Sequence, residues 1–75
     1  MRTIQTTTQE VTLGPDSGLT IVNSATSTGT LTIQVRLVTE WVTIGTVSPG
    51  TVQYVDARNI TIRCLVSGSV NYGFV

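Results

Sequence analysis

The stretch "GTLTIQVRLVTEWVTIGTV", from Gly29 to Val47, decides the fold class of this chain. In its first half the apolar residues Leu31, Ile33, Val35 and Leu37 alternate with the polar residues Thr30, Thr32, Gln34 and Arg36. Alternation with a period of two is typical of a strand with one buried face and one polar face. A second apolar segment, from Trp41 to Val47, follows after Thr39 and Glu40, and this order predicts a β-hairpin.

Short segments of the same kind recur along the whole chain. Turn and loop signals separate them, namely "GPDSG" (14–18), "NSATSTG" (23–29), "SPG" (48–50), "DARN" (56–59) and "SGS" (67–69). We expect about seven short strands in an all-β fold, either a small antiparallel β-sandwich or a jelly-roll-like barrel. Residues 1–10 are interpreted as an N-terminal arm or edge strand, and residues 11–75 as a single β domain.

The small size of the chain points to a partner. A chain of 75 residues builds only a small core. Disulfides, metals or oligomerisation commonly stabilise such chains. With one Cys and no His, neither an intrachain disulfide nor a Cys/His zinc site can form, so we expect no metal and no cofactor. Another copy of the same chain is the simplest partner.

The charge pattern argues against nucleic acid and membranes as partners. The net charge is zero, and the basic residues Arg2, Arg36, Arg58 and Arg63 are scattered along the sequence. Binding to nucleic acid requires clustered positive charge. No apolar run approaches the roughly 20 residues that a membrane-spanning helix needs. The N-terminal "MRTIQTTTQE" has no apolar signal-peptide core, which favours synthesis in a cytoplasm.

The residue types argue against an enzyme. Catalysis by a Ser or Cys nucleophile needs a nearby base, and the chain has no His. The carboxylates Glu10, Asp16, Glu40 and Asp56 lie near predicted turns or edges, where capping and solubility are their ordinary roles. Cys64 lies on the apolar side of a predicted strand and is interpreted as a core residue. We therefore expect no catalytic residues.

The polar stripes are the candidate contact surface. Thr side chains crowd the first half of the chain, and they can meet another protein without the cost of desolvating a charge. High β propensity of Thr is an equally good explanation. Trp41 is open to two readings, as a core residue or as an exposed interface anchor. The candidate interface residues are Ile4, Thr6, Thr8, Gln34, Arg36, Trp41 and Arg63.

Two segments carry a resemblance to a class of viral proteins. "GTLTIQVRLVTEWVTIGTVSPG" (29–50) is followed by "NITIRCLVSGSVNYGFV" (59–75), which ends on a strand. This succession resembles the short β-rich proteins of tailed-bacteriophage virions, in particular capsid decoration (cement) and head-fibre base proteins. The resemblance implies a small β-sandwich or jelly-roll-like fold, self-association often as trimers, and attachment to a capsid lattice. It implies no individual binding residue.

We therefore expect a non-enzymatic virion structural protein that self-associates and binds the capsid exterior, where it stabilises the shell. Its expected partners are further copies of itself, with a homotrimer favoured, and the major capsid protein or other virion subunits. The expected location is the capsid surface of the virion, after synthesis in the host cytoplasm. Two alternatives stay open. One is a β module that binds a small ligand or glycan through Trp41, Tyr54 and Tyr72, and the other is a phage tail or head-to-tail connector component.

Overall fold

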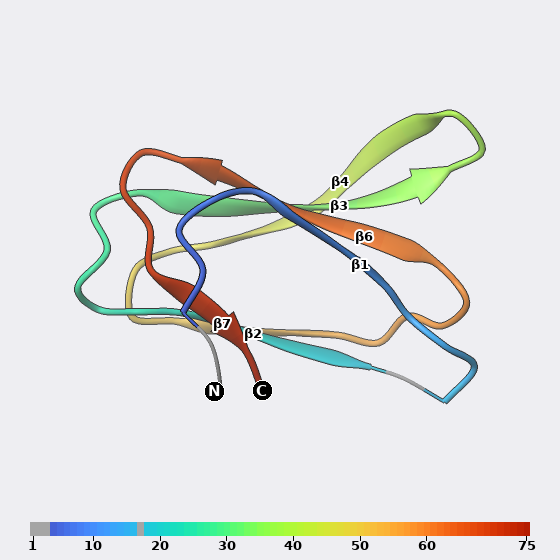
Figure 1. Cartoon of the computed structure of the whole chain (residues 1–75), viewed down its shortest axis with the longest axis horizontal. Helices are drawn as coiled ribbons and strands as arrows, with labels where there is room; N and C mark the ends of the chain where they lie inside the picture. The colour runs from blue at the N-terminus through green and yellow to red at the C-terminus, as the bar shows by residue number, and fades with distance from the viewer. Residues whose placement is uncertain (1–3, 17) are drawn as a thin grey trace.

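Two antiparallel sheets form a β-sandwich in the computed structural model, which describes residues 4–16 and 18–75. The strands are β1 (Gln9–Thr12), β2 (Leu19–Asn23), β3 (Thr30–Leu37), β4 (Glu40–Val47), β5 (Val52–Val55), β6 (Thr61–Ser67) and β7 (Tyr72–Phe74). The larger sheet has the order β1-β6-β3-β4 and the smaller sheet the order β5-β2-β7. Figure 1 shows the sheets as two layers. The all-β prediction and its sandwich form are confirmed. The barrel alternative is wrong, because no strand pairing joins the two sheets in the described part of the chain.

The core lies between the two sheets and follows the alternation in the sequence. Leu31 and Ile33 of β3 are fully buried, whereas Thr32 and Gln34, which alternate with them, point to the other face. The neighbouring strand β6 repeats this pattern, with Ile62 and Cys64 buried. The buried apolar cluster consists of Leu13, Ile21, Leu31, Ile33, Val47, Val55, Ile62, Cys64, Val70 and Tyr72. Side chains from both sheets therefore fill one continuous core.

The apolar stripe of β3 extends past the end of this core. Val35 is only half-buried, and Leu37 is 48% exposed. The reason is visible in Figure 1, where the β3–β4 hairpin bends away from the smaller sheet, so that no opposing layer covers its far end. The prediction that all four apolar residues of β3 are buried is correct for Leu31 and Ile33 and wrong for Leu37.

Most strand pairs join segments far apart in the sequence. Within the described residues, β3 and β4 are the sequence neighbours that pair with each other, whereas β1 pairs with β6, and β2 pairs with β5 and β7. Apart from β3 and β4, consecutive strands therefore pass from one sheet to the other. The position of one sheet relative to the other then depends on contacts between the layers rather than on short hairpins.

Asn23 supplies a polar contact between the layers. It lies at the end of β2 in the smaller sheet, and its side chain is fully buried. Its amide nitrogen Nδ2 donates hydrogen bonds to the carbonyl oxygens of Val47 (2.9 Å) and Gly29 (3.3 Å). Val47 ends β4, and Gly29 precedes β3 in the larger sheet. The sequence interpretation placed Asn23 in a polar loop. This is wrong, because the amide is needed inside the sandwich, and the loop occupies residues 24–29.

Replacement of Asn23 by Ala should destabilise the fold strongly. The substitution removes both hydrogen bonds that Nδ2 donates to buried backbone carbonyl oxygens. It also removes the buried Oδ1, which has no hydrogen-bond partner in the described structure and offsets part of this loss, so the net cost should be about 2 kcal/mol. Urea unfolding followed by tryptophan fluorescence measures this difference. Asn71→Ala is the matched control, since the Asn71 side chain makes an exposed bond to Thr26, and we expect a change below about 0.5 kcal/mol. An Asn23→Ala variant as stable as the control would contradict the assigned role.

The hairpin between β3 and β4 turns at Val38 and Thr39, next to the predicted position. Val38 has a φ of 57° and a side chain that is 91% exposed. A positive φ is sterically costly for a β-branched residue, whereas Asn tolerates it. Asn59 has a similar φ of 54°. The backbone of Val38 is therefore strained. Burial of its side chain does not offset this strain, because the side chain is exposed in the described structure.

Replacement of Val38 by Gly should stabilise the fold by about 1 kcal/mol, because Gly adopts a positive φ without a steric penalty. For a domain of this size, this corresponds to a rise in melting temperature of roughly 4–8 °C. Asn59→Gly is the control, since Asn already tolerates this conformation, and its effect should be clearly smaller. Thermal unfolding monitored by circular dichroism measures both. If the Val38→Gly protein melts below the parent, the strain argument is wrong.

Candidate functional site: a patch on the outer face of the larger sheet

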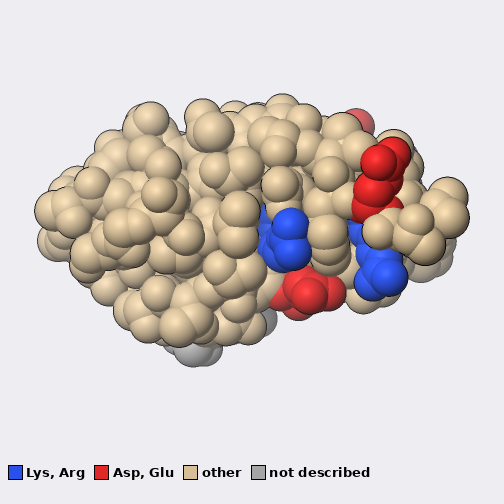
Figure 2. Space-filling model, turned by 90° about the horizontal axis from the view of Figure 1, so that it is seen from above, with Lys and Arg blue, Asp and Glu red and all other residues tan. Residues whose placement is uncertain are grey.

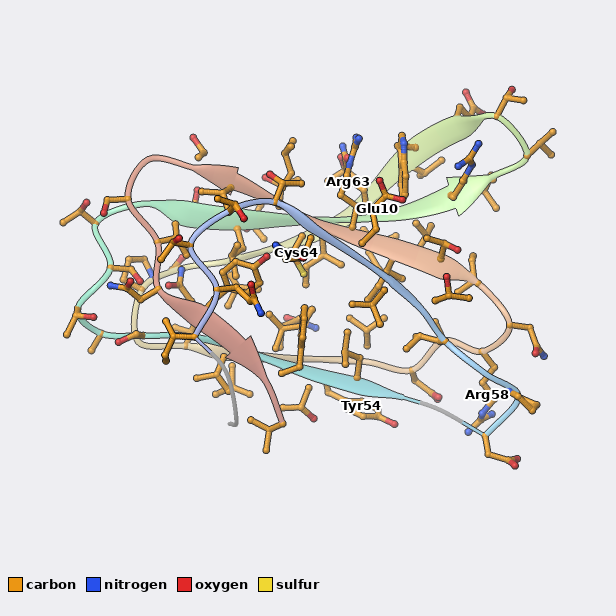
Figure 3. The ribbon with its side chains drawn as sticks, viewed as in Figure 1. Glu10, Tyr54, Arg58, Arg63 and Cys64 are labelled. Atoms are coloured by element: carbon orange, nitrogen blue, oxygen red, sulfur yellow. The ribbon has the colours of Figure 1, made fainter. Side chains whose placement is uncertain are left out.

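Cross-strand pairing gathers several candidate residues on the outer face of the larger sheet. Arg36 lies opposite Trp41, Gln34 lies opposite Arg63, and Arg63 lies opposite Glu10 on the next strand. Residues that pair across neighbouring strands point to the same face of a sheet. We define the outer patch by these side chains, namely Glu10, Gln34, Arg36, Trp41 and Arg63. Figure 3 shows Glu10 and Arg63 on the side of the larger sheet that faces away from the core.

Trp41 is the centre of the outer patch. The Arg63 guanidinium carbon lies 4.3 Å from the centroid of the indole ring, and that of Arg36 lies at 5.9 Å. Cation–π contacts of this kind contribute about 0.5–1 kcal/mol each at exposed sites. Trp41 is half-buried and lies outside the core cluster. The core reading of Trp41 is therefore wrong, and the interface-anchor reading stays a prediction.

Hydrogen bonds hold the arginine side chains in place. Nε of Arg63 donates to Oε1 of Gln34 (2.9 Å), and Nη2 of Arg63 donates to the same oxygen. The Gln34 amide in turn donates to the Thr43 hydroxyl (3.1 Å). Nε of Arg36 donates to the carbonyl oxygen of Val38 at the hairpin turn (3.4 Å). The guanidinium groups are thus oriented by neutral acceptors, which leaves their positive charge available.

The charges of the outer patch have no ionic partners within the described structure. Across residues 4–16 and 18–75, the ion pair formed is the exposed contact between Arg58 and Asp56 (3.6 Å), outside the outer patch. Figure 2 shows that charged groups of both signs gather on one half of the face viewed from above, and that most of this face is uncharged. The outer patch therefore combines an aromatic ring, two cations and one carboxylate on a largely neutral surface.

The N-terminal candidates lie elsewhere. Gln5 forms a β-bridge with Tyr72 of β7, so Ile4 and Thr6 lie beside the smaller sheet, and both are exposed. The Tyr72 hydroxyl donates to the carbonyl oxygen of Thr7 (2.6 Å). Thr8 is exposed, and its hydroxyl accepts a hydrogen bond from the amide of Val66 (3.1 Å). The structure therefore brings Gln34, Arg36, Trp41 and Arg63 together and separates Ile4 and Thr6 from them.

The aromatic residues of the ligand-binding alternative do not share a face. Trp41 lies on the outer face of the larger sheet, Tyr54 is exposed on β5 of the smaller sheet, and Tyr72 is fully buried. Tyr72 packs edge-to-face against Phe74, with ring centroids 5.8 Å apart. These three rings therefore do not form a common stacking platform. The part of the chain that the structure describes contains no pocket. It also contains no group of three or more His, Cys, Asp or Glu residues that could hold a metal ion.

In residues 4–16 and 18–75, no helix is of the length and apolar character required to cross a bilayer.

Cys64 is a core residue, as the sequence predicted. It is fully buried on β6, and burial raises the pKa of its thiol to about 11. Burial, followed by the Coulombic effect of Cys64, raises the pKa of the neighbouring core residue Tyr72 to about 12, although a backbone hydrogen bond opposes this shift. Both groups are therefore neutral near pH 7. Their neutral forms favour the folded state, and this contribution to stability is lost as the pH rises through these raised pKa values.

Cys64 should resist thiol reagents as long as the protein is folded. At pH 8 a thiol with a pKa of about 11 is ionised in roughly one molecule in a thousand, and the thiolate is the reactive form. We expect modification by an aromatic disulfide reagent to be at least about 100-fold slower for the native protein than for the protein in urea. Absorbance of the released thiolate measures the rate. Complete reaction of the native protein within seconds would show that Cys64 is accessible.

Glu10 is a member of the outer patch that the sequence interpretation missed. Its carboxylate was assigned to capping and solubility because it lies near a predicted turn or edge. The pairing of β1 with β6, which places it opposite Arg63, 53 positions further along the chain, has no local signal. The alternation of Glu10 with Val11 was the available signal, since it places Glu10 on the polar face of its strand. Comparison of the chain with protein families, with curated proteins and with solved structures found no match.

Proposed function

We propose that this chain is a non-enzymatic structural protein of a tailed-bacteriophage virion, of the capsid decoration or cement type. In this proposal it self-associates and binds the capsid exterior, and it stabilises the shell by binding the assembled form. The viral assignment rests on the sequence resemblance of residues 29–50 and 59–75.

The outer patch is the observation that best supports a role in protein binding. Trp and Arg are enriched among the residues that dominate the binding energy of protein interfaces. Here one Trp and two Arg side chains lie together on the outside of a rigid sheet, and Gln34 and backbone oxygen atoms hold the guanidinium groups in place. Such preorganisation lowers the entropy cost of binding. The surrounding Thr side chains lose little on desolvation, because they carry no charge.

The composition supports the same role. The small core and the absence of an intrachain disulfide leave association as a further source of stability. Partners that bind only the folded state stabilise it by mass action. A decoration protein in contact with its neighbours and with the shell obtains stability in this way.

Light scattering after size-exclusion chromatography tests self-association, and we expect an oligomer that dissociates on dilution. In the Trp41→Ala variant the association constant should fall about 30-fold, as expected for the loss of an interface anchor worth about 2 kcal/mol. Tyr54→Ala, on the smaller sheet, is the matched control and should leave the mass unchanged. A parent protein that is monomeric at every concentration would refute self-association, and a larger ring would favour the connector alternative.

Binding to the particle needs a separate measurement. The fluorescently labelled protein should co-sediment with empty capsids of a tailed phage that carries the gene, in a saturable manner. Excess unlabelled protein should displace it. Recovery of the protein on purified tails instead of capsids would move the assignment to a tail component.

A further inference from the structure

Glu10 and Arg63 are neighbours across β1 and β6, but their side chains form no ion pair in the described structure. They lie opposite each other on β1 and β6, and both face outward (Figure 3). Arg63 instead directs two of its nitrogen atoms to Gln34 and stacks on Trp41, toward β3 and β4. The cation is thus turned away from the nearest carboxylate, and opposite charges lie side by side on the outer patch without cancelling each other.

We propose that a second copy of this chain binds the outer patch, with Glu10 of each copy against the guanidinium groups of Arg36 and Arg63 of the other. This inference rests on the proposed self-association and names the surface that performs it. A two-fold contact between identical chains requires a surface that complements itself. The outer patch meets this requirement, because it presents both signs of charge and none of them takes part in the ion pair found in the described structure.

The same pattern disfavours a small anion or a uniformly acidic partner. Either would be attracted by Arg36 and Arg63 but repelled by Glu10, which lies opposite Arg63. A second copy brings its own arginines to Glu10 and its own carboxylate to the arginines, so each charge gains a partner. Trp41, which contacts both arginines, is then covered in the same contact, and burial of its ring adds to the binding energy.

The positions of Arg36 and Glu10 on the larger sheet suit such a contact. Arg36 is exposed, and its Nε is bound to the turn carbonyl of Val38, so its terminal nitrogens remain as donors. Glu10 is exposed on β1, the strand at the opposite edge of the larger sheet from β4. Across the sheet the order is therefore Glu10, Arg63, Arg36 and Trp41, with the carboxylate at one side of the outer patch and both arginines beside it. This separation allows each copy to give and to receive a charge pair in the same contact.

Charge reversal in separate chains tests this proposal. Arg36→Glu makes the outer patch predominantly acidic, and Glu10→Arg makes it entirely basic. We expect each single variant to associate at least about 10-fold more weakly than the parent, because like charges then face each other. An equimolar mixture should recover the association, since an acidic patch then meets a basic one. Arg36 and Glu10 are both exposed, so neither change should impair folding, and circular dichroism verifies this.

Arg58→Glu is the matched control, because Arg58 is an exposed arginine whose partner is Asp56, outside the outer patch. This variant should associate like the parent. If the parent oligomerises but the reversals at Arg36 and Glu10 leave its association unchanged, or if the mixture stays as dissociated as the single variants, this surface is wrong and the proposed self-association still stands. If the parent itself is monomeric throughout, self-association fails and this inference fails with it.

Discussion

The buried amide of Asn23 is the contact on which the arrangement of the two sheets depends. It connects the end of β2 with the end of β4 and with the residue before β3. The backbone of Asn23 is also bonded to the turn after β4, through Thr51 and Gly50. Inside a low-dielectric core such bonds are strong, and any displacement of one sheet would leave polar groups unpaired. Apolar packing has no directional requirement, whereas these hydrogen bonds fix the distance and orientation of the amide relative to the larger sheet.

The core and the N-terminal segment depend on each other in a similar way. Tyr72 is fully buried, yet its hydroxyl must find an acceptor, and the carbonyl oxygen of Thr7 provides it. The backbone bonds between Gln5 and Tyr72 place this segment along the edge of β7. Residues that the sequence assigns to an arm or edge strand therefore contribute to the packing of a core residue. In a domain with so few buried side chains, this contribution is substantial.

Local alternation was sufficient to predict the elements but not their partners. The period of two in β3 and β6 correctly identified Leu31, Ile33, Ile62 and Cys64 as core residues, because burial on one face of a strand imposes that period. The pairing of β1 with β6 is not encoded in any local pattern, so the position of Glu10 beside Arg63 could not be derived. Asn23 was missed for a different reason. A polar residue at a strand end looks like the start of a loop unless the buried carbonyl groups that it satisfies are known.

The outer patch itself was only partly predictable. The polar stripe of β3 identified Gln34 and Arg36. The position of Trp41 after the turn left it open whether its ring packs in the core or at an interface. What could not be seen was that Trp41 contacts Arg63 on β6, with Gln34 of β3 between them in the sheet. That contact depends on the order of strands in the sheet, which is a tertiary property.

The proposed association uses the face of the larger sheet and not its edge, and the shape of β4 is the reason for this choice. β4 is an edge strand of eight residues with one charged side chain, Glu40, and an edge of that length invites pairing with another chain. However, the register of β3 and β4 shifts after Ile33, and Ile44 is left as an extra residue next to Gly45. A bulge of this kind twists the strand and interrupts the row of backbone groups that a new strand would need. The side chains of the outer patch begin next to this shift, at Gln34, and cross-strand pairs and hydrogen bonds hold them in place. A partner that binds the side chains of this face contacts a fixed surface. A partner that adds a strand to β4 would have to bind an interrupted edge.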